Sequence, residues 1–347
     1  MRIDRTTFSH FVFVFLISLC LFSCRHDRKI DTSFYYWKTV YKQNPVETGY
    51  LRHFKTHRLY VRIMDVDVDD DALPIPISPI TFKDRLPDTL QIVPVVFIVN
   101  DVLKSITKPQ LNILANHIAA FVNAKVAQAG KTNYDELQMD CDWTAATRDS
   151  YFYLLKQLAA SPLLKNKKLS ATLRLHQLKN QVKSGIPPVS RVMLMCYNMG
   201  DLRKYGSQNS ILQLSELKQY LNDNISNYPM PVDVGLPLFH WAVVFRNKQY
   251  IGLSKTIKIN DLLNKNQFIF MGNTLYQAIA DVPAFELKKG DVVRWESVSV
   301  ADLQSTAAYI APFIKADNLN IIYFHLDQEV LTAYTYEDLE KVNHIFN

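Results

Sequence analysis

Eight short apolar runs, each followed by a segment of helical character, constrain the fold of this chain more than any other feature. The runs are rich in β-branched and aromatic residues. Their centres are nearly continuously apolar, as in parallel strands that are buried on both faces. The expected strands are Ser33–Trp37, Arg58–Asp65, Gln91–Asn100, Glu136–Asp142, Ser170–His176, Arg191–Tyr197, Val232–Trp241 and Asn320–Leu326. Eight strand–helix units predict an α/β protein with a (β/α)₈ barrel, which needs about 250 residues.

The helical segments and the spare length complete this plan. The expected helices are Lys38–Lys55, Pro109–Ala129, Ala146–Ala159, Ile211–Asn224, Val300–Lys315 and Thr335–Asn347. Most of the spare length lies between the seventh strand and its helix, where short strand-like runs alternate with turns. We therefore expect an insertion subdomain over residues 246–296, within a barrel that spans residues 24–347. The Pro-rich stretch Leu73–Ile80 is expected to form a second, irregular loop.

The N-terminus is typical of an export signal. Arg2 and Arg5 precede an apolar run over residues 11–22, which is too short and too early for a membrane-spanning helix. Its ending, "LFSC", resembles a bacterial lipobox. The resemblance implies that residues 1–23 are removed, that Cys24 is lipidated, and that the protein is exported and anchored to a membrane. An ordinary cleaved signal is the alternative, because Phe22 is larger than the usual lipobox residue.

Composition and cysteine use exclude several classes of protein. The net charge of +6 is mild and the basic residues are scattered, so we expect no nucleic-acid partner. The nine glycines form no phosphate-binding loop, and no cofactor is expected. Inside the fold, Cys141 and Cys196 alternate with polar residues that should face inward, so both should be free and packed against helices. We expect a monomer.

Polar and aromatic residues gather at the expected carboxyl ends of the strands, where barrel enzymes carry their reactive groups. They are Trp37, Asp65, Asp67, Asn100, Asp140, Asp142, Trp143, His176, Tyr197, Asn198, His240, Trp241, His325 and Asp327. Flat rings can stack on pyranose faces, and carboxylates and amides can bind hydroxyl groups. The pattern therefore indicates a sugar site. The histidines lack H-x-H or H-E-x-x-H spacing, so a metal site is not expected.

The fourth strand resembles the D-G-x-D-x-D-x-E signature of family 18 glycoside hydrolases, the chitinase-like barrels. Asp140 and Asp142 fall on the second and third acids, whereas Thr144 replaces the catalytic glutamate. Leu137 and Gln138 replace the first acid and the glycine. "MLMCYNMGD", "VDVGLPLFHW" and "NIIYFHLDQE" are similar to the sixth, seventh and eighth strands of this family. The sequence also resembles a group of exported bacterial lipoproteins with a D-x-D-W-T segment, from which no activity can be carried over.

The resemblance implies a glycan containing N-acetylhexosamine as the ligand. In this family the acetamido group of the substrate attacks the anomeric carbon, and the glutamate protonates the leaving oxygen. The aspartate and tyrosine roles fall on Asp142 and Tyr197. Thr144 cannot act as an acid, and losing general acid catalysis costs about 10²–10⁴-fold in rate. Asp140 is a candidate substitute, because nearby carboxylates raise each other's pKa values. His176 is another.

Structural roles compete with these functional ones. Asp140 and Asp142 could satisfy hydrogen bonds inside the barrel, and Trp143 could be a packing residue. The acidic run Asp65–Pro74 lacks the glycine and glutamate of a calcium loop, so a solvated loop is expected, although Asp65 can face the mouth.

Three hypotheses follow for the function. The first is a glycoside hydrolase-like barrel with Asp140, Asp142 and Tyr197 at its centre and a displaced acid. The second is an inactive carbohydrate-binding or scaffolding lipoprotein. The third is a barrel with unrelated hydrolase chemistry. Trp37, Asp65, Asn100, Trp143, Thr144, His176, Asn198, His240, Trp241 and His325 are the expected ligand-binding residues.

Overall fold

The structure is a computed structural model that describes residues 28–71 and 73–347. The expected signal segment and Cys24 lie outside the described residues. No helix within these two ranges is long and apolar enough to cross a membrane.

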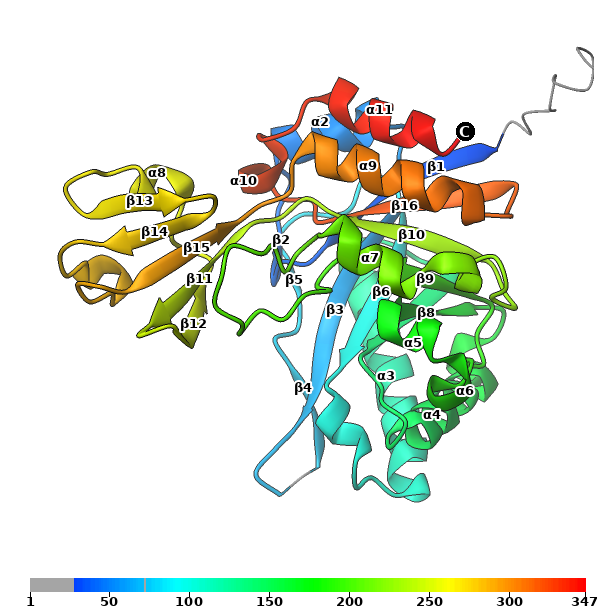
Figure 1. Cartoon of the computed structure of the whole chain (residues 1–347). Coiled ribbons are helices and arrows are strands. Elements are labelled where there is room, and N and C mark those ends of the chain that lie inside the picture. Colours follow the sequence, from blue (N-terminus) through cyan, green and yellow to red (C-terminus); the bar gives the residue numbers. More distant parts are fainter. Residues whose placement is uncertain (1–27, 72) are drawn as a thin grey trace, which may run out of the picture.

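Eight parallel strands close into a barrel, as the sequence predicts (Figure 1). They are β1 (Lys29–Tyr36), β3 (Arg58–Val68), β6 (Gln91–Ile98), β7 (Glu136–Cys141), β8 (Lys168–Arg174), β9 (Arg191–Met195), β10 (Val232–Pro237) and β16 (Asn318–Phe324). The order around the barrel follows the chain, and β1 closes it by pairing with both β16 and β3. Each of the eight predicted strands corresponds to one of these.

Several strands end before the predicted residue. Asp142, His176 and Tyr197 lie one or two residues beyond the ends of β7, β8 and β9. The largest correction concerns the seventh strand, which stops at Pro237, whereas Trp241 begins the next sheet. The apolar pattern continues past the ladder because residues at the barrel mouth are also buried, so periodicity alone does not mark the strand ends.

Helices cover the outside of the barrel and begin at the capping residues present in the sequence. Thr107, Ser299 and Thr335 each form a capping box at a helix start. The helices are α2 (Pro45–His53), α3 (Lys108–Gln128), α4 (Arg148–Ala160), α5 (Leu175–Lys179), α6 (Gln181–Ser184), α7 (Leu214–Tyr220), α8 (Ile259–Leu262), α9 (Val300–Ile310), α10 (Gln328–Leu331) and α11 (Tyr336–Ile345).

Two helices have only half of their predicted length. The predicted helix Lys38–Lys55 is only α2, because Asn44 caps it and Pro45 fits the first helical position. The short strand β2 (Val40–Tyr41) occupies the preceding residues and pairs with β5 (Thr81–Phe82). The predicted helix Ile211–Asn224 is reduced to α7 and a following 3₁₀ turn.

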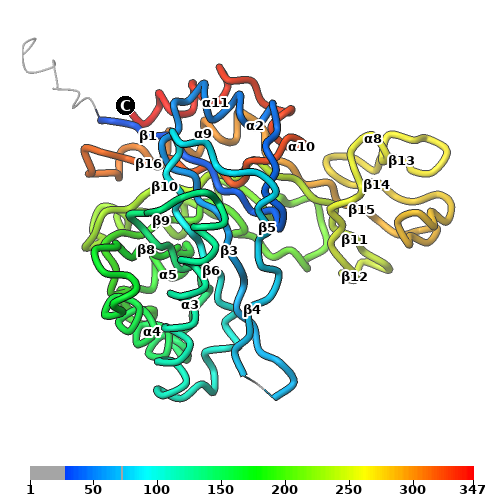
Figure 2. The backbone as a smooth tube through the Cα atoms, turned by 180° about the vertical axis from the view of Figure 1, so that it is seen from behind, coloured from blue at the N-terminus to red at the C-terminus, as the bar shows by residue number. Residues whose placement is uncertain are grey.

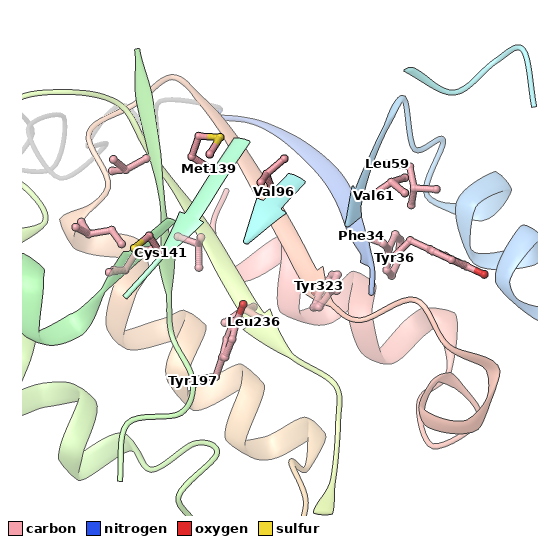
Figure 3. Close-up of a cluster of buried hydrophobic side chains, with 14 of the residues drawn as sticks. Phe34, Tyr36, Leu59, Val61, Val96, Met139, Cys141, Tyr197, Leu236 and Tyr323 are labelled. Carbon is pink, nitrogen blue, oxygen red and sulfur yellow. The ribbon is translucent and has the colours of Figure 1, made fainter. Parts of the chain in front are cut away.

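The main apolar core fills the layer between the barrel and its helices, and Figure 3 shows part of it. Met139, Cys141 and Leu236 belong to this layer. Cys141 and Cys196 are fully buried and free, which confirms their expected packing role. Alternate side chains point into the barrel, so Asp140, between Met139 and Cys141, faces the interior.

The Pro-rich stretch Leu73–Ile80 contains a strand, and the prediction of an irregular loop there is wrong. Strand β4 (Pro74–Ile77) pairs antiparallel with the end of β3 and projects with it from the barrel (Figures 1 and 2). An edge strand tolerates proline because the missing N–H leaves no ladder hydrogen bond unmade. The turn before β4 is closed by the Asp69 carboxylate, which accepts hydrogen bonds from the backbone N–H groups of Asp71 and Leu73.

A second, antiparallel sheet lies between β10 and α9 in the chain and beside the barrel in space (Figure 1). Its strands are β11 (Trp241–Arg246), β12 (Gln249–Ser254), β13 (Phe268–Gly272), β14 (Leu275–Ala278) and β15 (Val292–Glu296). The sheet has an apolar core of its own. It begins at Trp241, five residues before the predicted insertion, because β11 follows β10 after a short loop.

A fully buried ion pair joins the second sheet to the loop that follows β9. Arg294 Nε lies 2.6 Å from Glu296 Oε1, and both side chains are inaccessible to solvent. The remaining guanidinium nitrogens donate to the carbonyl oxygens of Leu202, Lys204 and Gly206. The other Glu296 oxygen accepts hydrogen bonds from Ser210 and from the indole of Trp241. Every charge in this cluster is therefore compensated.

We predict that Arg294→Met lowers the free energy of unfolding by about 3–5 kcal/mol, because it leaves the Glu296 carboxylate buried without its cation. Urea unfolding measures the change. Lys288→Met is the matched control, since Lys288 forms an exposed pair with Asp281, and its effect should be small. Equal losses in both variants would contradict the prediction.

Candidate functional site

The carboxyl ends of the barrel strands surround a cavity of about 190 Å³. Its lining combines two carboxyl groups, a guanidinium group and several aromatic rings. The lining residues are Tyr35, Trp37, Phe97, Asp140, Asp142, Thr172, Arg174, Met195, Tyr197, Asn198 and Phe324. The structure thus brings together the three residues expected at the centre of the site, Asp140, Asp142 and Tyr197.

Asp140 is the deepest acid in the site, with only 6% of its surface exposed. The Thr172 hydroxyl donates a hydrogen bond of 2.6 Å to one of its oxygens. The pKa of Asp140 is raised to about 7, mainly by burial; the Thr172 hydrogen bond lowers it and the charge of Asp142 raises it. The expected mutual effect of the two acids exists, but burial is the larger cause. Asp140 can therefore hold a proton at neutral pH.

Asp142 forms a two-pronged ion pair with Arg174. Arg174 Nε lies 2.9 Å from Asp142 Oδ1, and Arg174 Nη2 lies 3.0 Å from Asp142 Oδ2. Such fork-like geometry fixes both side chains. Arg174 was absent from the predicted site.

The register of the barrel explains both partnerships. Met139 on β7 pairs with Ala171 on β8, so Asp140 lies opposite Thr172 and Asp142 lies opposite Arg174. Aligning the two predicted strands could have identified Arg174, because neighbouring parallel strands place such residues side by side.

Trp143 is a packing residue, and its expected role as a sugar platform is wrong. Its side chain is completely buried and stacks on Tyr151 with ring centroids 5.1 Å apart. The indole N–H donates to the carbonyl oxygen of Ser184. No face of the ring is left for a ligand, because helix α4 folds over it.

Gln177 holds the ends of β7 and β8 together. Its amide oxygen accepts a hydrogen bond from the backbone N–H of Arg174, and its amide nitrogen donates to the carbonyl oxygen of Trp143. Gln177 is itself buried. It therefore orients the two chain segments that carry Asp142 and Arg174.

A smaller outer cavity of about 120 Å³ adjoins the same residues. Asp142, Arg174, Tyr197 and Asn198 line both cavities, and His176 lines only the outer one. Burial raises the pKa of Tyr197 well above its ordinary value, so its hydroxyl stays protonated and can donate. Burial and the charge of Arg174 lower the pKa of His176, which favours a neutral imidazole.

Thr144, which the resemblance of the fourth strand aligns with a catalytic glutamate, is exposed and lines neither cavity. Its backbone N–H donates to the Thr147 hydroxyl, which in turn donates to Asn100 Oδ1 at 2.6 Å. Asn100 therefore supports the loop after β7 and does not line the cavities.

Four other predicted ligand residues also lie outside both cavities. Asp65 pairs with Arg62. His240 packs against Trp295, and Trp241 donates to Glu296, at the junction with the second sheet. His325 follows β16, and burial lowers its pKa to about 4, so its imidazole is neutral.

No protein-family model matches the sequence, and no curated protein matches it. Solved structures do resemble the fold. The spore cortex-lytic enzyme SleL of Bacillus cereus has a TM-score of 0.53 at 13% identity, covering 92% of this chain and 75% of SleL. A chitinase from Chromobacterium violaceum has a TM-score of 0.52 at 11% identity, covering 92% of this chain and 98% of the chitinase. Catalytic domain 2 of the Ostrinia furnacalis Group II chitinase has a TM-score of 0.53 at 10% identity, covering 91% and 96%.

The chain therefore folds as a (β/α)₈ barrel with a second sheet inserted after the seventh barrel strand. More specifically, its fold is similar to the folds of chitinases and of a spore cortex-lytic enzyme.

We predict that Asp140→Asn changes the pH dependence of stability. Because the folded-state pKa of Asp140 is about 7, above the ordinary value for aspartate, wild-type stability falls as the pH rises from about 4 to about 7. The variant lacks this loss, so its stability relative to wild type should increase over that range, by up to about 4 kcal/mol. Denaturant unfolding at pH 4.5 and pH 8 measures the difference. Parallel pH profiles would contradict it.

Proposed function

We propose that this protein binds a glycan containing N-acetylhexosamine at the cavity formed by Asp140, Asp142, Arg174 and Tyr197, and that it does not carry out the standard hydrolysis of chitinase-like barrels. The observation that carries the proposal is the position of Thr144. It supplies no carboxyl group, and its side chain faces solvent outside both cavities.

The cavity lining supports sugar binding. Trp37, Phe324 and Tyr197 supply aromatic surface, while Asn198 and the two aspartates supply polar groups for hydroxyls. Structures with a similar fold are consistent with this class of ligand. The Ostrinia furnacalis Group IV chitinase is known in complex with allosamidin, and a mutant of the Group II catalytic domain 2 in complex with (NAG)5.

Asp142 is also poorly placed to replace the missing acid. Both of its oxygens accept hydrogen bonds from Arg174, so neither oxygen is free to donate to a leaving oxygen. The same pair holds Asp142 at the cavity wall, where it can accept a hydrogen bond from a ligand.

Hydrolysis with a displaced acid is the second candidate, and the state of Asp140 favours it. A pKa of about 7 would let Asp140 donate a proton at neutral pH. His176 is the other titratable group beside Asp142 in the outer cavity. This candidate requires the leaving oxygen to reach the floor of the cavity, where Asp140 is almost completely buried.

We further propose that the protein is exported and anchored to a bacterial membrane through a lipid on Cys24. The support is the sequence "LFSC" after a basic and then apolar N-terminal segment. A lipid-anchored barrel would hold its glycan site near the cell envelope.

We predict that tri-N-acetylchitotriose binds to wild type and that Tyr197→Phe weakens binding about five- to tenfold, by removing one hydrogen-bond donor. Isothermal titration calorimetry measures both affinities. Tyr153→Phe is the matched control, because the Tyr153 hydroxyl bonds to Asn112 in an exposed position. Absence of binding to wild type would refute the proposed function.

Turnover of the same trisaccharide separates the two candidates. The binding proposal predicts none above the uncatalysed rate. The second candidate predicts turnover that falls as the pH rises through about 7 and that Asp140→Asn lowers about 10²–10⁴-fold. Product formation followed by chromatography distinguishes these outcomes.

The anchor is tested separately. We predict that Cys24→Ser moves the full-length protein from the membrane fraction to the soluble fraction of an exporting bacterial host. Cys141→Ser is the control, since Cys141 is buried within the barrel layer. Equal membrane retention of wild type and Cys24→Ser would exclude a lipid on this residue.

A further inference from the structure

We infer that the cavity of about 190 Å³ binds the free ammonium group of a de-N-acetylated hexosamine, with the Asp140 carboxylate as its counter-ion and aromatic rings beside it. The inference rests on the proposed function, because it names the form of the amino sugar that the site prefers. The ligand is then a glycan in which at least one hexosamine has lost its acetyl group.

Asp140 is a buried acid that no cation of the protein contacts. Its Oδ1 accepts a hydrogen bond from the Thr172 hydroxyl, whereas its Oδ2 has no hydrogen-bond or ion-pair partner within residues 28–71 and 73–347. Oδ2 nevertheless keeps accessible surface, and Asp140 lines the cavity. A buried carboxylate without a cation is costly, so a cavity beside it favours a ligand that supplies the positive charge.

The charges of the lining sum to one negative charge when Asp140 is ionised. Asp142 and Arg174 neutralise each other through their two-pronged pair. Asp140 is the only other charged residue among the described residues that line this cavity. Asp65, which also acts on Asp140, is paired with Arg62. One ammonium group therefore makes the site neutral, whereas an acetamido group supplies no charge to balance Asp140.

Aromatic rings form a continuous wall of the same cavity. The ring centroid of Phe324 lies 5.8 Å from that of Tyr35 and 5.5 Å from that of Trp37. Tyr197 extends the wall, with its ring centroid 5.5 Å from that of Phe324. All four rings line the cavity. Ring faces attract cations, most strongly where water is excluded, so the wall and the carboxylate favour the same kind of ligand group.

Three trisaccharides test the inference on wild type. They are tri-N-acetylchitotriose, its fully de-N-acetylated form, and cellotriose, which has neither an acetamido nor an amino group. Calorimetry at about pH 6.5 keeps the amines charged, since amino groups of this kind titrate near pH 8. We expect the de-N-acetylated trimer to bind about tenfold more tightly than either neutral trimer. The net charge of +6 excludes a general attraction of cations to the protein as the cause.

Asp140→Asn removes the counter-ion and keeps the shape of the side chain. We expect the preference for the de-N-acetylated over the acetylated trimer to fall at least about fivefold. Glu136→Gln is the matched control, because Glu136 is a buried acid on the same strand that accepts a hydrogen bond from the Ser170 hydroxyl and lies outside both cavities. It should leave the preference unchanged.

Phe324→Leu tests the aromatic wall. Leucine keeps apolar volume beside the cavity but has no ring face, so the preference for the de-N-acetylated trimer should fall about two- to fivefold. An unchanged preference in this variant would show that the wall does not contact the ammonium group and would overturn that part of the inference.

The outcomes separate the inference from the proposed function. If wild type binds tri-N-acetylchitotriose and binds the de-N-acetylated trimer no more tightly, the inference fails and the proposed function stands. A preference that survives Asp140→Asn would also overturn the inference. If only the de-N-acetylated trimer binds, the inference stands and the proposed N-acetylated ligand is wrong. If wild type binds none of the three trimers, both fail.

Discussion

Closure of the eight-stranded barrel is the constraint on which the site depends. Because β1 pairs with both β16 and β3, no barrel strand has a free edge along its full length, and the register of each strand is set by two neighbours. The carboxyl ends of β7, β8 and β9 are consequently adjacent. Thr172 meets Asp140, Arg174 meets Asp142, and Met195 lies opposite Arg174 on the next strand. A one-residue slip would turn each of these side chains to the outer face.

The two ends of the barrel use buried charge differently. At the amino ends of the strands, Arg191 pairs with Asp233 and Arg58 lies near Glu136, so each buried acid has a cation nearby. At the carboxyl ends, Asp140 and Asp142 share a single nearby cation, Arg174. Both prongs of Arg174 bind Asp142. Asp140 receives only a threonine hydroxyl. Burial is the main cause of the raised pKa of Asp140, and no cation binds this carboxyl group directly to offset it. Groups left in this state cost stability, and they are typical of sites shaped for a ligand.

The order of elements was predictable from the sequence, because hydrophobic periodicity reports burial and every barrel strand is buried. The ends of the elements were less predictable. Trp241 extended the apolar pattern of the seventh strand although it does not lie in a barrel strand. Residue type and position at a strand end were enough to predict that Asp140, Asp142 and Tyr197 belong to the site. Arg174 was missed because its importance comes from its partner on another strand. Asn100 and Trp143 were expected to bind the ligand but instead contact Thr147 and Tyr151. These contacts depend on tertiary packing, which the sequence pattern does not report.

The second sheet is connected to the site through the loop after β9. Asn198, at the rim of both cavities, begins this loop, and its backbone N–H donates to the carbonyl oxygen of Ile211. The adjacent Ser210 is held by Glu296 of β15, which also binds Trp241 and Arg294. The position of Asn198 therefore depends on a buried charge cluster in a separate sheet. An insertion held by charges that are all compensated can support a cavity wall more rigidly than a free loop, because moving it would expose or unpair those charges.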